Sequence, residues 1–430
     1  MTGRHQGTGQ TLAVPISRDL VAPSPLRVAL ATLALQAAIG VSYTWGALAP
    51  FALSQTHWTS LQVAAMFSAT PAGYGFGIVV AGRLADLQPP RRLLRIGYAI
   101  FAAGLLGAFL FPNPYTLIVL YAGIGVGFAG GFTLAAGLAA LRQAFPQRVG
   151  TLGGIQAAVF AGSALALVPM VTYLAPRYGW VSALGGTGAV LAVLSGLALL
   201  QMPHLPRPRH HEEGAHPPLL AVAAQPLVWS AFLIELTATP LGSYSFVHVG
   251  LEASRFGVAA WIVSAVVSAF IAGNGSGRLI GGAATDRWGV HTVVGALFAS
   301  SLLGAALLYF ASAPLPIFLG SLLAGVGFGA PAGILPRLSA EAMPSAPNTA
   351  SGLIFTGYTT GAFAGPLLGE LISPAPTGWL EMAVLPIAGL LILFLRARFA
   401  PRANLADPGP SMIAATEQPN SAAERTSPPD

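Results

Sequence analysis

The stretch AGNGSGRLIGGAATDRWGVH, residues Ala272 to His291, decides how the rest of this chain is interpreted. It begins inside a long apolar segment and ends among charged residues. Arg278 lies in the apolar part, about two helical turns before the polar exit at Asp286 and Arg287. A charge at the centre of a membrane helix costs roughly 2.5–3.5 kcal/mol on insertion scales, so Arg278 must face protein, water or an anion. We therefore expect the remaining chain to hold Arg278 beside a substrate path.

The composition is that of a membrane protein. Of 430 residues, 54% are apolar and only 8% are charged, whereas soluble domains carry about 25% charged residues. The absence of cysteine excludes disulfides and cysteine–metal sites. All 20 basic residues are arginines, spread thinly over short loops. Membrane topology therefore explains the positive charge better than a nucleic-acid partner does.

The apolar segments predict twelve membrane spans, because a span needs about 20 mostly apolar residues. We expect an all-α integral membrane protein with twelve transmembrane helices in two six-helix repeats. The predicted spans are 28–53, 60–82, 93–111, 115–141, 152–175 and 179–202 in the first half, and 226–249, 258–283, 292–311, 315–337, 349–372 and 378–399 in the second.

One long polar interruption divides the spans. It contains HLPRPRHHEEGAHPP and predicts a central cytoplasmic loop over residues 204–225. The six-helix halves then cover residues 27–203 and 226–400, with a polar N-terminal tail over 1–26 and a disordered tail over 401–430. The histidines of the central loop are residues that commonly bind metals. However, this loop is rich in proline and carries charges of both signs, which favours a solvated linker. We therefore expect no metal site.

Arginine placement predicts the orientation. Only Arg177 and Arg255 fall in outer loops if both termini are cytoplasmic, and this asymmetry follows the positive-inside rule. We therefore predict a multi-pass protein of the inner or plasma membrane. The inner loops then hold Arg83, Arg91, Arg92, Arg95, Arg142, Arg148, Arg207, Arg209, Arg287 and Arg337.

The two halves repeat each other in sequence. Gly82-Arg-Leu-Ala-Asp86 follows the second span, and Gly282-Ala-Ala-Thr-Asp286 follows the eighth. The fourth span contains Ala122-Gly-Ile-Gly-Val-Gly-Phe128, and the tenth contains the similar Ala324-Gly-Val-Gly-Phe-Gly329. Such repeats commonly place a substrate site near the midplane between the halves, which rock against each other.

Twelve spans, a polar central loop and the repeated Gly-x-x-x-Asp together resemble the major facilitator superfamily. In that superfamily the motif latches the cytoplasmic side, so the resemblance implies gate residues at Gly82, Asp86, Gly282, Asp286 and Arg287. The second copy fits the motif well, whereas the first lacks the basic residue that usually follows the aspartate. The glycines also indicate close helix packing.

A narrower resemblance is to the monocarboxylate transporter and oxalate/formate antiporter branch. It rests on Gly40-Val-Ser-Tyr-Thr-Trp45, Trp58-Thr-Ser60, Phe246-Val-His-Val249 and Asn274-Gly-Ser-Gly-Arg278. In that branch the eighth-span arginine binds the substrate carboxylate, which implies this role for Arg278.

The chain also departs from that branch. Animal monocarboxylate transporters carry an aspartate where this chain has Asn274, and a lysine near the position of Ala47. Oxalate antiporters use a second basic residue in the eleventh span, near Thr360 here. A single buried cation favours a monoanion over a dianion such as oxalate.

Five residues are the candidate substrate contacts. The guanidinium fork of Arg278 can bind a carboxylate with two parallel hydrogen bonds, unless the arginine is structural or reaches the cytoplasmic edge. Asn274 lies one turn earlier, and Tyr43 either lines the cavity or packs as an interfacial aromatic. Tyr358 and Thr360 occupy the region where relatives keep a substrate-binding side chain.

Two residues are candidates for proton coupling. Glu235 in the seventh span lies at a depth similar to that of Arg278. It could carry a proton, form a permanent ion pair with Arg278, or stay protonated and unpaired. His248 lies near the outer end of the same span and could sense external pH, although a histidine at a helix end is more often only hydrated.

The sequence contains no set of residues typical of an enzyme active site. It also lacks a Walker-type phosphate-binding loop, so ATP-driven transport is not indicated. We expect a secondary transporter without cofactors that moves a small organic monoanion, by proton symport or anion exchange. Its partners would be the anion, a proton or counter-anion, and the lipid bilayer. One alternative is a proton-driven exporter of an amphipathic compound, although the usual fifth-span Gly-Pro pattern is absent from Gly162 to Pro169. Another is a transporter-like receptor, for which the tails offer no output domain.

Overall fold

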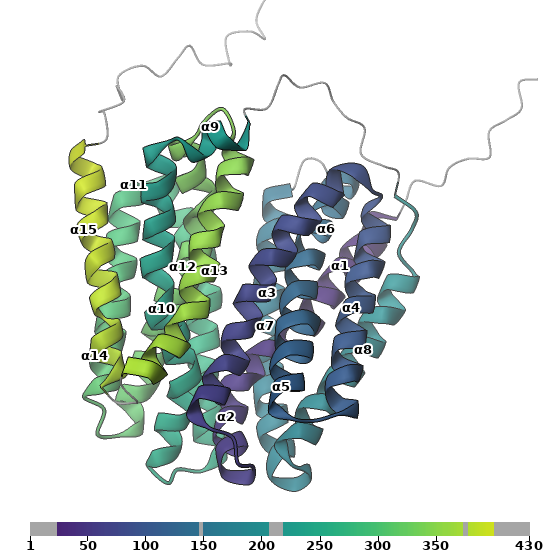
Figure 1. The fold of residues 1–430 in the computed structure, drawn as a ribbon, viewed down its shortest axis with the longest axis vertical. Helices are drawn as coiled ribbons and strands as arrows, with labels where there is room; N and C mark the ends of the chain where they lie inside the picture. The colour runs from purple at the N-terminus through teal and green to yellow at the C-terminus, as the bar shows by residue number, and fades with distance from the viewer. Residues whose placement is uncertain (1–23, 146–148, 206–217, 373–376, 400–430) are drawn as a thin grey trace, which may run out of the picture.

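The computed structural model describes residues 24–145, 149–205, 218–372 and 377–399, and its regular elements there are all helices. Figure 1 shows two bundles side by side, with α1 to α8 in purple to blue and α9 to α15 in teal to yellow. The first bundle contains α1 (Pro25–Ile39), η1 (Gly40–Thr44), α2 (Trp45–Gln55), α3 (Ser60–Leu87), α4 (Pro90–Leu110), α5 (Pro114–Thr116), η2 (Leu117–Phe128), α6 (Ala129–Ala144), α7 (Val149–Tyr178) and α8 (Trp180–Leu200).

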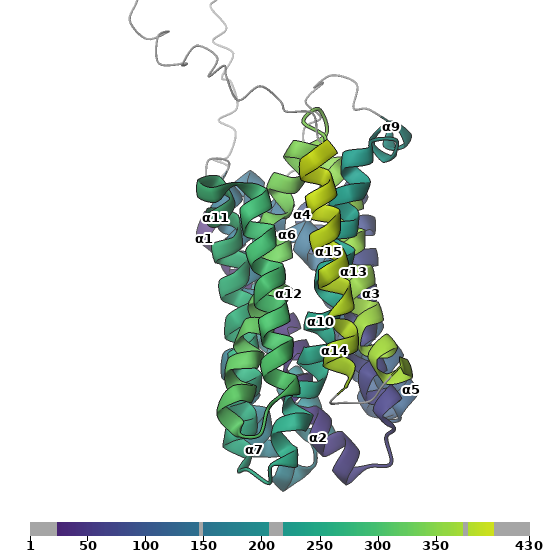
Figure 2. The ribbon, with the colours of Figure 1, turned by 90° about the vertical axis from the view of Figure 1, so that its left-hand side faces the viewer.

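The second bundle begins after the central loop. It contains α9 (Leu219–Ala223), α10 (Pro226–Arg255), α11 (Ala260–Tyr309), α12 (Pro314–Ala342), α13 (Pro347–Ile372), α14 (Gly378–Met382) and α15 (Val384–Phe399). We call the end of the molecule with α9 and the end of α15 the central-loop end, and the opposite end the far end. Both α9 and the end of α15 lie at the top of Figure 1, and Figure 2 shows α14 and α2 toward the far end.

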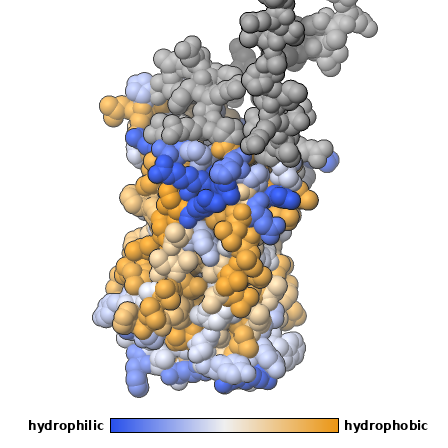
Figure 3. Space-filling model, turned by 90° about the vertical axis from the view of Figure 1, so that its right-hand side faces the viewer, coloured by the Kyte–Doolittle hydropathy of each residue, from blue (hydrophilic) through white to orange (hydrophobic). Residues whose placement is uncertain are grey.

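The predicted all-α membrane fold is confirmed. Among the residues that the structure describes, ten helical segments are long and apolar enough to cross a membrane. Two further long helices, α10 and α13, carry more polar residues and are not in that set. Figure 3 shows the corresponding surface, with apolar side chains over the middle of the face and hydrophilic ones gathered toward both ends.

Local sequence signals set where the helices begin and turn. Proline occupies the first turn of α1, α4, α5, α10 and α12, where its missing N–H costs nothing. A capping box of Thr59 and Gln62 starts α3. Within α11, two spans meet at Gly289, which has φ 75° and ψ 157°. This backbone region is essentially restricted to glycine, so Gly289 allows the chain to reverse between the two spans.

Buried apolar side chains form one shared core and two separate ones. The shared core joins both halves and includes Tyr43, Trp45, Phe246 and Phe270. The other two belong to one half each: one gathers α10, α11, α12 and α13 near the central-loop end, and the other gathers α1, α3, α4 and α6. The halves are therefore joined through the middle and far end, and each has its own core near the central loop.

The contact between the halves at the far end depends on glycine. Gly46 of α2 faces Gly250 and Phe246 of α10 so closely that a Cβ at Gly250 would collide with the backbone carbonyl oxygen of Gly46. A Cβ at Gly46 would lie 2.9 Å from the Phe246 carbonyl oxygen. Side chains at either position would force α2 and α10 apart, so these glycines permit the far end to close.

Candidate functional site

Arg278 lies at the interface between the halves, held by neutral hydrogen-bond partners. Its Nε donates to Asn274 Oδ1, one turn earlier on α11, at 2.9 Å. One of its terminal nitrogens donates to the Tyr358 hydroxyl of α13 at 3.4 Å, and the side chain also interacts electrostatically with Tyr43. The structure therefore brings together four of the five predicted substrate contacts.

Tyr43 connects the first half to this cluster. It lies in η1, the tight 3₁₀ segment that interrupts the first span, and it is 5% exposed. Its hydroxyl accepts a hydrogen bond from Asn274 Nδ2 at 3.0 Å. The edges of Phe160 and Phe246 meet its ring at centroid distances of 5.2 and 5.4 Å. The amide of Asn274 thus joins the two halves by donating to Tyr43 of the first half, while it accepts from Arg278 on its own helix.

The positive charge of Arg278 has no anionic partner among the described residues, where no carboxylate lies within ion-pair distance. A guanidinium carries five N–H donors, and the three named partners are all neutral. The side chain is half-buried. Donors and charge therefore remain for a carboxylate.

Tyr74 is a member of this site that the sequence analysis did not single out as a contact. It comes from α3, is 9% exposed, and interacts electrostatically with both Arg278 and Tyr43. Its ring stacks on Phe160 of α7 at 5.4 Å. The site thus has three tyrosines from three helical segments around one guanidinium, with aromatic walls from both halves. Sequence spacing gave no sign that α3 and α7 would meet here.

Glu235 lies fully buried on α10, and neither of its carboxylate oxygens has a hydrogen-bond partner among the described residues. It shares a helix face with Gly242 and Phe246, seven and eleven residues further on. Gly242 packs on Phe328 of its own half, whereas Phe246 packs on Tyr43 of the first half.

No ion pair between Glu235 and Arg278 occurs in the described part of the chain. The predicted alternative of a permanent pair is therefore not what the structure shows. Glu235 instead interacts electrostatically with Tyr358, whose hydroxyl contacts Arg278. Thr239, one turn along α10, donates to the Tyr358 carbonyl oxygen at 3.0 Å. Tyr358 thus interacts with both groups, electrostatically with Glu235 and through its hydroxyl with Arg278.

Thr360 is the predicted contact that lies outside this cluster. It is exposed on α13, whereas the neighbouring Thr359 is 7% exposed and faces Gly75 of α3. A Cβ at Gly75 would lie 2.6 Å from the Thr359 hydroxyl oxygen, so this is a close contact between the halves. A shift of one residue on a helix turns a side chain by about 100°, which explains why Thr359 points inward and Thr360 does not.

His248 is buried and contacts Glu370. It therefore differs from the more common histidine at a helix end, which is hydrated. It is 2% exposed, and its Nε2 lies 2.7 Å from Glu370 Oε1 on α13. Sequence analysis did not identify Glu370, because the partner lies 122 residues away. The pair is near the far end, apart from the Arg278 cluster.

Comparison with known families identifies the chain. Residues 30–262, more than half of its length, match the profile described as Major Facilitator Superfamily. The chain belongs to the major facilitator superfamily. Residues 225–381 also match the profile described as Sugar (and other) transporter. No curated protein matches significantly.

Solved structures of two transporters have the same fold. A bacterial homologue of the human lysosomal transporter Spinster, in an inward-facing and unoccupied conformation, aligns over 87% of this chain and 97% of its own, with a TM-score of 0.68 and 14% identity. The nucleoside transporter NupG aligns over 87% and 99%, with a TM-score of 0.67 and 17% identity. This superfamily member is therefore a multi-pass membrane transporter and not an enzyme.

The gate residues implied by the superfamily motif are only partly described. Gly82 is exposed, and a Cβ there would meet no atom within 4 Å. Gly282 packs toward the backbone of Gly333 in its own half, and Arg287 is exposed. The side chains of Asp86 and Asp286 lie outside the described residues. The histidine-rich run over 207–216 does so as well.

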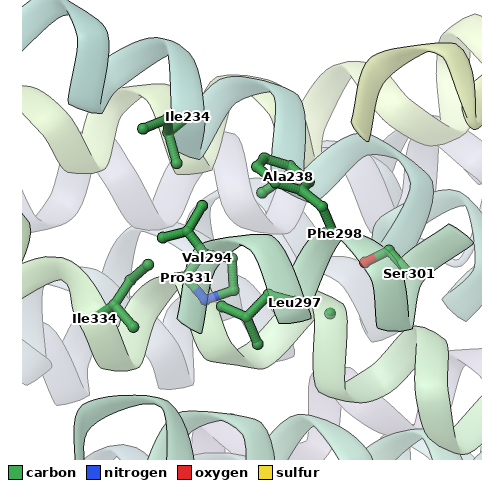
Figure 4. A pocket seen from close by; sticks show the side chains of 9 residues that line it. Ile234, Ala238, Val294, Leu297, Phe298, Ser301, Pro331 and Ile334 are labelled. Carbon is green, nitrogen blue, oxygen red and sulfur yellow. The ribbon is translucent and has the colours of Figure 1, made fainter. Parts of the chain in front are cut away.

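A small void in the second half is not the substrate site. It holds about 10 Å³, near the lower limit for one water molecule. Figure 4 shows apolar side chains around it, including Ile234, Val294 and Phe298, with the hydroxyl of Ser301 as a polar group. Its size and apolar walls suit loose helix packing, and Arg278 does not line it.

Proposed function

We propose that this transporter moves a small organic monoanion, most simply a monocarboxylate, by alternating access. The observation that carries the proposal is the half-buried guanidinium of Arg278, which neutral groups orient and which no carboxylate of the described chain neutralises. A bidentate carboxylate fits the unused donors of the fork. The resemblance to the monocarboxylate branch at Arg278 points to the same substrate class.

The two halves, residues 27–203 and 226–400, would rock about this site. We place the central-loop end and both termini in the cytoplasm of an inner or plasma membrane, because arginines concentrate at that end. The described structure has its shared core at the middle and far end, which supports a state with access from the cytoplasm. Closure of the gate at Gly82 and Gly282 would give the opposite state.

Glu235 would couple transport to protons. A fully buried carboxylate without hydrogen-bond partners is costly when ionised, so it favours a bound proton. Anion entry at Arg278 would change the electrostatic environment of Tyr358 and, through it, of Glu235. Proton symport follows if Glu235 exchanges its proton in each cycle, and anion exchange follows if it stays protonated.

The experiment is uptake of labelled lactate, pyruvate and formate into proteoliposomes under an imposed pH gradient. Two charge-stabilised hydrogen bonds contribute about 3–6 kcal/mol together, so Arg278→Ala should weaken apparent affinity by at least about 100-fold. The matched control is Arg177→Ala, which removes an exposed arginine at the far end and should transport normally.

Three results would overturn the proposal. Transport of no carboxylate by the wild type would exclude the substrate class and favour the exporter of amphipathic compounds, tested with a labelled lipophilic cation. Normal transport by a folded Arg278→Ala protein would exclude the site. Binding without uptake of any compound would favour the receptor alternative.

A further inference from the structure

A buried histidine–glutamate contact joins α10 to α13 near the far end. His248 Nε2 lies 2.7 Å from Glu370 Oε1, and the two side chains are 2% and 10% exposed. The imidazole also stacks on the Tyr244 ring at 4.0 Å. Neither residue contacts the Arg278 cluster in any described hydrogen bond, so the pair is separate from the proposed anion site.

The backbone fixes which nitrogen of His248 carries a hydrogen. Nδ1 lies 2.8 Å from the Tyr244 carbonyl oxygen, which can only accept, so Nδ1 must donate. In a neutral imidazole with hydrogen on Nδ1, Nε2 is an acceptor. An ionised Glu370 is also only an acceptor. A contact of 2.7 Å between them therefore needs one more proton, either on Nε2 or on the carboxyl group.

We propose that His248 and Glu370 together form a proton-binding site, and that its proton holds the far ends of α10 and α13 together. Loss of the proton would leave two acceptors facing each other at hydrogen-bond distance, and they would separate. The inference goes beyond the proposed function, because it depends on neither the identity of the anion nor on Arg278.

Further titratable and charged groups lie beside this pair. Tyr244, whose ring stacks on His248, interacts electrostatically with Glu370, Glu381 and Glu252. Arg255 is already engaged by Glu252 at 2.9 Å. Of these carboxylates, Glu370 alone has a hydrogen-bond contact with His248 among the described residues.

Packing would transmit the change to the neighbouring helix α14. Trp379 of α14 meets the rings of Tyr244 and His248 at 5.7 and 6.3 Å. Its indole N–H donates to the Ser245 hydroxyl at 3.1 Å. Separation of His248 from Glu370 would therefore disturb three helices at the far end together.

Spin-label distances test this directly, because the chain contains no cysteine. Labels at Ser254→Cys on α10 and Ile372→Cys on α13 occupy exposed positions. Purified protein in nanodiscs should give a short, narrow distance distribution near pH 5 and a longer, broader one near pH 8, roughly the range in which histidine titrates. Glu370→Gln should keep the short distance throughout, because its amide donates to Nε2 without a bound proton.

A second variant and two controls complete the test. His248→Gln also offers a permanent donor, so it should be equally insensitive to pH if Glu370→Gln does not fold. Glu252→Gln, one turn from His248, and Arg278→Ala should keep the wild-type pH response. Distances that do not change with pH in the wild type, or a full pH response in folded Glu370→Gln, would overturn the proposal. Either result leaves the anion site untouched, and failure of the anion site leaves this test intact.

Discussion

Asn274→Asp should turn anion binding into a proton-dependent reaction. The substitution keeps the size of the side chain and places a carboxylate oxygen at the position that now accepts from Arg278 Nε at 2.9 Å. The Tyr43 hydroxyl can donate to that carboxylate in place of accepting from the amide. The change therefore removes the net positive charge of the site without leaving a buried polar group unpaired.

The magnitude follows from Coulomb's law. A substrate carboxylate on the free edge of the guanidinium would lie about 6 Å from the introduced carboxylate. With an effective dielectric constant of about 20, the repulsion is about 3 kcal/mol, or about 100-fold in affinity. Protonation of the introduced group removes this repulsion, so affinity should recover as the pH falls.

The assay is equilibrium binding of labelled lactate to purified protein across a range of pH. Asn274→Ala is the matched control, because it removes the orienting hydrogen bonds and adds no charge. It should weaken binding by about 10-fold, the value of one such bond, with little pH dependence. Binding by folded Asn274→Asp that equals the wild type at neutral pH would refute the reasoning that an unneutralised Arg278 attracts the anion.

Three further predictions concern coupling, closure and stability. Glu235→Gln should abolish lactate accumulation driven by a pH gradient but keep exchange of labelled for unlabelled lactate, and accumulation at the wild-type level would exclude Glu235 as the proton carrier. Gly250→Leu should hold the far end apart, because a side chain there collides with Gly46. A cysteine at the buried position Val249 should then react with an impermeant maleimide, whereas it stays protected with Gly250 intact. Gly289→Ala should destabilise the protein by about 1–3 kcal/mol in detergent unfolding, because alanine does not tolerate this φ/ψ region; the helical control Gly186→Ala should cause no such loss.

Much of the fold follows from the sequence. The lengths of apolar segments predicted twelve spans, and ten helical segments in the described part of the chain meet the length and composition of a span. The two remaining ones, α10 and α13, are less apolar because they carry Glu235, His248, Tyr358 and Glu370. A polar group inside a span is costly in lipid and is therefore retained mainly where protein or substrate surrounds it.

Part of the site was also predictable. Arg278 and Asn274 share a helix face by spacing alone, and their hydrogen bond follows from it. The meeting of Tyr43 with Asn274 did not follow from spacing, because the two residues are 231 positions apart. Tyr74 and Glu370 were missed for the same reason. The choice between Thr359 and Thr360 depends on the rotation of α13, which no sequence pattern fixed.

The most direct test of the central claim is a comparison of lactate with lactamide, its neutral amide, in equilibrium binding to purified protein. If Arg278 binds a carboxylate, the wild type should prefer lactate by at least about 100-fold, and Arg278→Gln should lose that preference while remaining folded. Equal affinity of the wild type for lactate and lactamide, or an unchanged preference in Arg278→Gln, would contradict the account.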